Sequence, residues 1–257
     1  MRVVAHPRWA VPRASLACSV THSRTKPTLN EPPRAPRGAL LLPRRYSQIT
    51  WRYYDVYLGI VMVYDAATGS VGPGAGHVHC RLAWAPHARA QWRWVDPGGL
   101  TGAEFIPAGP PGAFDSHVCF AAHQPVRVAD GSARVYYMGG NGPHSGLRNS
   151  SFALATLRPD RFAGLGGDAG TVTTRALLVT SASLIATVDV RRGGGSVVFG
   201  VVGGGAALAR SAPVMSNCTD CAIAWPRAAG GLASFVGRNV SFTVTVDCAV
   251  LYTLGFA

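Results

Sequence analysis

The sequence predicts an all-β protein, on the evidence of its turn residues, its strand-forming residues and the spacing of its apolar runs. The 257-residue chain contains 31 Gly and 18 Pro, which supply many turns. Val, Thr and Tyr recur throughout, whereas Lys and Glu, which favour helices, are scarce. The apolar runs are short and end at turn-forming residues, as strands do. A chain of this length can bury a sizeable core and form one or two domains.

Residues 1–52 differ from the rest of the chain in charge. They hold nine Arg, one Lys and a single acid, Glu31, and so carry +9 of the net charge of +12. A basic segment can bind nucleic acid or an acidic membrane surface, but an Arg- and Pro-rich segment with almost no acid is typical of disorder. We therefore expect a disordered leader and no nucleic-acid partner. A transit peptide and a wrongly assigned start both stay open as alternatives.

Residues 53–168 contain an approximate repeat. Each copy has an apolar run, a Gly-rich loop, a second apolar run and an aromatic segment, and Leu82-Ala83 aligns with Leu154-Ala155, 72 residues later. Repeats with several strands each are typical of β-propeller blades. The strands expected from this pattern are Leu58–Tyr64, Cys80–Trp84, Gln91–Val95, Arg134–Met138 and Phe152–Leu157.

Residues 169–257 have a different pattern, with short strand candidates roughly ten residues apart and alternating polarity, which is typical of a β-sandwich. We place the domain boundary near Gly166–Gly170. The expected strands are Val172–Thr174, Leu177–Val179, Leu184–Val190, Ser196–Val202, Ala222–Trp225, Val240–Val246 and Val250–Phe256.

From Tyr53 to its end, the chain resembles glycoside-hydrolase-like proteins that have a five-bladed β-propeller, are related to glycosidase families 32 and 43, and carry a C-terminal β-sandwich. The resemblance implies a partial β-propeller followed by a β-sandwich, and a carbohydrate as the partner. The segments that carry it are Tyr57–Asp65, Leu82–Val95, Gly112–Val118, Val135–Gly146, Phe152–Leu165 and the strand-rich tail that closes with VLYTLGFA.

The chain departs from that family in length. A propeller blade takes roughly 60 residues, so the segment before the sandwich has room for about two blades, and the earlier blades of the family are expected to be missing from its N-terminal side. Glycoside hydrolysis needs two carboxyl groups, and only one Glu follows the leader. The alternative is therefore a non-catalytic glycan-binding or structural module.

The candidate catalytic residue is Asp115, which stands before an expected strand at a position that the resemblance places near the propeller funnel. The candidate substrate-binding residues are His144 and Arg148, because both side chains can donate hydrogen bonds to oxygen atoms from a polar loop; a solvated loop is the alternative. Glu104 is a weaker candidate for an acid. Asp55 and Asp65 flank a strand and are expected to be turn or surface acids.

No metal or cofactor is expected. His77, His79 and His87 with Cys80 could be imagined as a metal cluster, but strand-surface or loop histidines explain them better. Cys218 and Cys221 have redox or zinc spacing, yet lack a second pair and a βαβ context. We expect a disulfide within the sandwich or two unpaired thiols there. The aromatic residues Trp84, Trp92 and Trp94 are expected to fill the core of a blade rather than to stack on sugars.

An extracellular or secretory location is expected from three N-glycosylation sequons, which begin at Asn149, Asn217 and Asn239. No clear signal peptide accompanies them. No apolar run is long enough to span a membrane. The sequence leaves the oligomeric state open.

Overall fold

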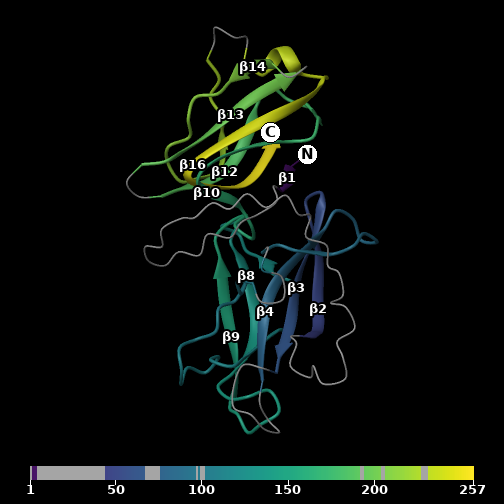
Figure 1. Cartoon of the computed structure of the whole chain (residues 1–257), viewed down its shortest axis with the longest axis vertical. Helices are drawn as coiled ribbons and strands as arrows, with labels where there is room; N and C mark the ends of the chain where they lie inside the picture. The colour runs from purple at the N-terminus through teal and green to yellow at the C-terminus, as the bar shows by residue number, and fades with distance from the viewer. Residues whose placement is uncertain are drawn as a thin grey trace. The chain divides into compact units, whose positions relative to one another are not determined.

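The protein is all-β in the computed structural model, which describes residues 2–4, 44–66, 76–96, 98, 102–191, 194–203, 206–226 and 231–257. These residues form strands and one short 3-10 helix, with no α-helix among them (Figure 1). The prediction of an all-β chain is therefore confirmed. The fold has two compact units: unit 1 combines strand β1 with Asp160–Ala257, and unit 2 comprises the described residues from Arg44 to Pro159.

Unit 2 is one curled sheet made of two antiparallel groups of four strands. The first group has the order β2-β3-β4-β5. In the second, β9 pairs along one edge of β8, and β6 and β7 pair one after the other along its opposite edge. A single parallel bridge, Val78 to Val118, joins β4 to β6. Propeller blades have four strands each, so this arrangement is compatible with the expected partial propeller of about two blades. The bounds are β2 Arg44–Tyr53, β3 Val56–Asp65, β4 His77–Ala85, β5 Arg93–Trp94, β6 Val118–Ala121, β7 Val126–Arg127, β8 Ala133–Gly140 and β9 Ser150–Leu157.

The two faces of this sheet have different chemistry, because successive side chains of a strand point to opposite sides. We call one side the histidine face; it carries His77, His79 and Arg81 on β4 and Tyr137 on β8. We call the other side the aromatic face; it carries Tyr64 on β3 and Phe120 on β6, whose rings both lie close to that of Tyr46. Residues on different faces therefore cannot belong to the same site on this sheet.

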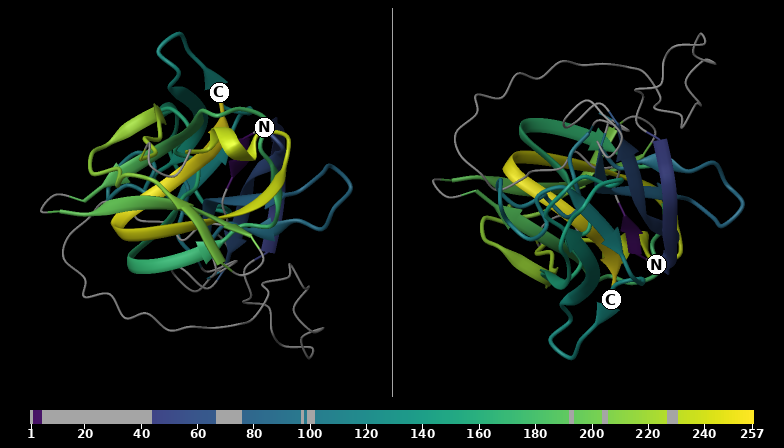
Figure 2. Two further views of the ribbon diagram at one scale, coloured as in Figure 1. Left: turned by 90° about the horizontal axis from the view of Figure 1, so that it is seen from above. Right: turned by 90° about the horizontal axis from the view of Figure 1, so that it is seen from below.

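Unit 1 is a second curled sheet organised by one long strand, β16 (Figure 2). The first half of β16 pairs with β13 and its second half with β12, while β10 pairs along its middle. Cys248, between the two halves, has a positive φ of 41°, so the strand bends there and belongs to both sides of the core. The bounds are β1 Arg2–Val4, β10 Leu165–Thr173, β11 Leu177–Leu178, β12 Leu184–Val190, β13 Ser196–Gly203, β14 Ala206–Arg210, β15 Cys218–Ala222, the 3-10 helix η3 Ala233–Phe235, and β16 Asn239–Phe256.

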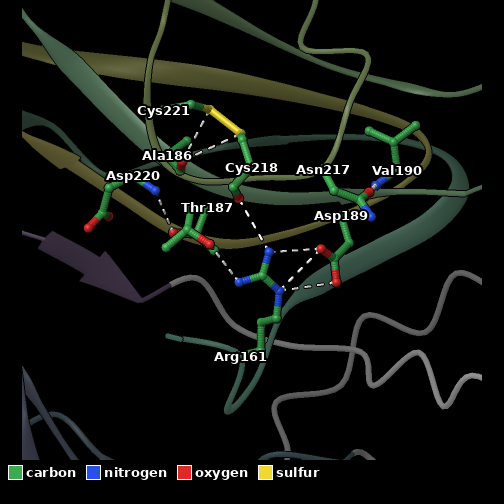
Figure 3. Close-up of polar contacts among 10 residues, drawn as sticks. Arg161, Ala186, Thr187, Asp189, Val190, Asn217, Cys218, Asp220 and Cys221 are labelled. Carbon is green, nitrogen blue, oxygen red and sulfur yellow. Dashed lines mark hydrogen bonds and ion pairs between the residues drawn. A yellow bond between two sulfur atoms is a disulfide. The ribbon is translucent and has the colours of Figure 1, made fainter. Parts of the chain in front are cut away.

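The start of unit 1 is fixed by Arg161, which is only 7% exposed. Its guanidinium forks onto both carboxylate oxygens of Asp189, with Nη2 2.9 Å from Oδ1, and Nη1 donates to Thr219 Oγ1 (Figure 3). The same group lies 5.4 Å from the ring centroid of Tyr252. The sequence analysis placed Arg161 within the blade-like residues 53–168, but its contacts lie within unit 1.

Several sequence-based boundaries differ from the structure. Arg44–Tyr53 pairs with β3 along its length, so the expectation of a disordered leader is wrong for residues 44–52; Ile49, Trp51 and Tyr53 alternate as in a strand, and the flanking arginines concealed this. Residues 5–43 of the expected leader lie outside the described residues. The strand expected at Ala222–Trp225 lies earlier, at Cys218–Ala222, and the last two expected strands are one.

The described residues contain two disulfides, and the different lengths of the loops that they close should lead to different effects on stability. Cys80–Cys119 spans 39 residues and Cys218–Cys221 spans three. On loop-entropy grounds, replacing the first pair by alanines should cost about 4 kcal/mol of unfolding free energy and replacing the second about 2 kcal/mol. Urea unfolding of both double variants measures this, and an equal loss would contradict the entropic account.

The core of unit 1 should respond strongly to loss of a buried aromatic side chain. Phe242 is fully buried next to Phe256, with ring centroids 6.1 Å apart. Phe242→Ala should therefore lower the free energy of unfolding by about 3–5 kcal/mol. Val236→Ala, at a side chain 47% exposed, is the control and should change it little in the same urea titration.

Candidate functional site

Asp115 lies in the turn before β6 and is held on the histidine face by a tyrosine. The Tyr137 hydroxyl donates to Asp115 Oδ2 at 2.8 Å. Burial, together with this hydrogen bond and the Asp115 charge, raises the pKa of Tyr137 to about 12. The phenol therefore stays protonated at physiological pH and remains a donor. The neighbouring Phe114 is 45% exposed, so an aromatic surface adjoins the carboxylate.

A glycine on β8 makes room for this turn. A Cβ at Gly139 would lie 2.6 Å from Asp115 Cβ and 3.0 Å from the Phe114 ring. Any side chain at that position would push Asp115 and Phe114 away from the strand. The absence of a side chain at Gly139 thus positions the candidate catalytic residue.

Glu104 is the second carboxylate of this face, and its two oxygens have different partners. His79 Nδ1 lies 2.5 Å from Oε1, and the Ala108 N–H donates to Oε2 at 2.6 Å. Burial opposes ionisation, but the two hydrogen bonds and the charges of His79 and Arg81 outweigh it and lower the pKa of Glu104. The sequence placed Glu104 only in a turn-rich loop, since nothing in the spacing showed that His79 faces it.

The structure brings Asp115 and Glu104 close together through two consecutive residues. Glu104 Oε2 accepts from Ala108, while Asp115 Oδ1 touches the position where Gly109 would carry a Cβ. Given the reach of one peptide unit, the nearest carboxylate oxygens are separated by roughly 11 Å at most. That range includes the carboxyl separations of both retaining and inverting glycosidases.

Three histidines extend the same face. The rings of His77 and His117 have centroids 4.6 Å apart, and those of His77 and His79 are 5.7 Å apart. Burial, followed by the charges of His117 and His79, lowers the pKa of His77 despite the opposing carboxylates. The Ser116 hydroxyl lies 2.8 Å from His117 Nδ1. The lowered pKa keeps the His77 imidazole neutral at neutral pH.

The imagined metal cluster is not assembled. Cys80 is bonded to Cys119, so it offers no thiolate, and His87 is an exposed turn residue. Within the described ranges, no group of three or more His, Cys, Asp or Glu side chains is arranged to hold a metal ion. Instead, His79 on β4 contacts Glu104, and His77 lies within the influence of the charges of Asp65 and Glu104.

His144 and Arg148 lie on the opposite side of the sheet from Asp115. The side chain of Arg148 packs over Gly140, the residue after Gly139, and consecutive strand residues face opposite sides. Its Nη1 donates to the carbonyls of Pro143 and His144. The structure therefore separates the candidate substrate-binding residues from the candidate catalytic one.

His144 is partly exposed and packs against aromatic rings. Its ring centroid is 5.0 Å from that of Tyr46 and 5.1 Å from that of Tyr64. Burial, and then the charge of Arg148, lowers the pKa of His144. This packing orders the loop on the aromatic face.

The other residues singled out in the sequence lie in the core, in a disulfide, or at turns and strand ends. Trp92 and Trp94 pack against the buried cluster of Val61, Val63 and Ala83, in agreement with the expected core role. Cys218 and Cys221 form a disulfide, one of the two expected states. Asp55 is an exposed turn residue, and Asp65 pairs with His77 at the end of β3.

Comparison with known proteins adds no assignment. No protein-family model matches the chain, and no curated protein matches it significantly. Among the described residues, no helix is long and apolar enough to cross a membrane. The function is therefore argued from the chemistry of the histidine face.

Stability should depend on pH through Glu104. Its pKa is below the ordinary 4.5 in the folded protein, so its ionisation stabilises the fold above about pH 4.5, and this contribution is lost as the pH falls through the folded-state pKa. As the pH falls from about 4.5 to the folded-state pKa, the unfolding free energy of the wild type should fall more steeply than that of Glu104→Gln. Urea unfolding between pH 3 and 7 measures both slopes. Asp55→Asn should keep the wild-type slope, and an unchanged slope in Glu104→Gln would contradict the assignment.

Proposed function

We propose that the protein is a glycoside-hydrolase-like protein that binds carbohydrate on the histidine face of unit 2. The supporting observation is the arrangement of Asp115, fixed by Tyr137 and flanked by the exposed ring of Phe114, with Glu104 roughly 11 Å away or less. Carboxylates accept hydrogen bonds from sugar hydroxyls. An exposed aromatic ring offers the apolar surface against which a sugar ring packs. Binding sites combine such apolar surface with a few fixed polar groups.

Binding is the function that this geometry supports best. Glu104 has both oxygens engaged, one by His79 and one by Ala108, which restrains it from moving toward a scissile bond. Its lowered pKa keeps it ionised, so it can accept hydrogen bonds but cannot serve as a general acid at neutral pH. A bound sugar would be recognised without being cleaved.

Hydrolysis is the second candidate function, favoured by the closeness of the two carboxylates. In that mechanism Glu104 and Asp115 would be the two carboxyl groups that hydrolysis requires, on opposite sides of a glycosidic bond. Burial of Tyr137 and the imidazoles of His77 and His117 would limit water at the site. The same variants test both functions.

An extracellular location belongs to this proposal. Asn149, Asn217 and Asn239, the first residues of the three sequons, are all exposed, as N-linked glycans require. Asn217 also accepts the Val190 N–H through its side-chain oxygen at 2.7 Å. Its amide nitrogen is not used in that contact.

The proposal predicts that Asp115→Asn and Phe114→Ala each weaken binding of a neutral oligosaccharide roughly tenfold or more, since a charged hydrogen bond and a stacking surface are lost. Isothermal titration with the best ligand from a glycan array measures the affinity. The matched controls are Asp55→Asn and Phe152→Ala, at an exposed acid and an exposed phenylalanine of unit 2. A blank array, or equal losses in the controls, would contradict the proposal. Release of reducing ends by the wild type but not by Asp115→Asn would establish hydrolysis.

A further inference from the structure

Arg81 is a buried cation with unsatisfied donors. It lies in the middle of β4 on the histidine face, is 7% exposed, and its Nε and Nη1 are buried without a hydrogen-bond partner. The charges of Glu104, Asp96 and Asp65 act on it. Glu104 nevertheless directs its oxygens to His79 and Ala108. The guanidinium is therefore left without an acceptor for these two nitrogens.

A second unsatisfied donor lies in the same row across the sheet. Gln48 on β2 and Arg81 on β4 both pair with Val61 on β3, so the three side chains share the histidine face. The amide nitrogen of Gln48 is also buried without a partner. It extends over Gly59, where a Cβ would lie 2.7 Å from it and 3.0 Å from the Trp92 ring. The missing side chain at Gly59 is what admits the amide.

Donors of this kind are costly when nothing accepts from them. Buried polar groups in folded proteins nearly always have partners, and an uncompensated buried charge opposes folding. An Arg guanidinium and a side-chain amide nitrogen are donor-only groups, and their natural complement is an oxyanion, which accepts several charge-assisted hydrogen bonds. A neutral sugar hydroxyl would accept only an uncharged, weaker hydrogen bond from them.

We propose that Arg81 and Gln48 form the subsite for the acidic group of an anionic carbohydrate, either a uronic acid carboxylate or a sulfate ester. This inference rests on the proposed carbohydrate-binding function and names its ligand class. Arg81 stands two residues from His79, which holds Glu104, so the acidic group binds next to the surface that takes the hydroxyls. Asp115 and Phe114 then contact the neighbouring sugar.

The test compares binding and stability in the full-length chain. The probes are an oligogalacturonate, a sulfated oligosaccharide, a neutral oligosaccharide of equal length and free sulfate. The wild type should bind at least one acidic probe roughly tenfold or more tightly than the neutral one, as expected for a charge-assisted pair. Arg81→Met should lose this preference while it keeps neutral binding, and its melting temperature without ligand should rise because two buried donors without acceptors are gone.

Matched variants make the outcome decisive. Arg134→Met, at an exposed arginine of β8, should keep the acidic preference, and Gln48→Leu should reduce it. Arg81→Lys keeps the charge but loses the two-pronged guanidinium, and should show an intermediate preference for the acidic probe. It provides the test if Arg81→Met does not fold.

Equal binding of acidic and neutral probes by the wild type, or an unchanged preference in Arg81→Met, would overturn the inference and leave the proposed function standing. Absence of all carbohydrate binding would overturn both. If free sulfate raises the melting temperature as much as the sulfated oligosaccharide does, the site binds an anion without recognising a sugar, which would also overturn the inference.

Discussion

The disulfide between Cys80 and Cys119 is the connection on which unit 2 depends. In the described part of the chain, the two groups of strands are joined by one β-bridge, Val78 to Val118, at the start of β4 and β6, and by the backbone hydrogen bond from the His144 N–H to the Gly76 carbonyl. A single bridge gives little resistance to separation of the groups, whereas the covalent bond holds them together. The contact of His77 with His117 lies at this junction, and Asp115 belongs to the turn that leads into β6. The candidate site thus lies beside the junction at which the disulfide joins the two groups.

Strand alternation then decides which side chains can act together. Gly139 and Gly140 are consecutive on β8, and one accommodates Asp115 while the other accommodates Arg148. The residues that looked like one site along the chain are thus divided between two faces. On the histidine face, the same alternation along β4 places His77, His79 and Arg81 together with both carboxylates.

The two units differ in how their buried polar groups are paired. Unit 1 buries an apolar core that includes Phe199 and Phe242, and satisfies its buried Arg161 with Asp189 and Thr219. Unit 2 buries Arg81 and the amide nitrogen of Gln48 without partners. Folded proteins tend to tolerate such local inconsistency where function requires it. The contrast between the two arginines is the reason for assigning a ligand to one and a structural role to the other.

The sequence by itself determined the all-β class and the strand pattern of β3, β4, β8 and β12, because alternation and turn residues are local properties. It also pointed to Asp115. It did not reveal β2, whose arginines resembled those of the leader, or the single bent strand β16. Only the tertiary structure paired Glu104 with His79 and aligned Gln48 with Arg81. Those relations depend on strand register and on the course of a loop, and both are set by contacts between residues far apart in the chain.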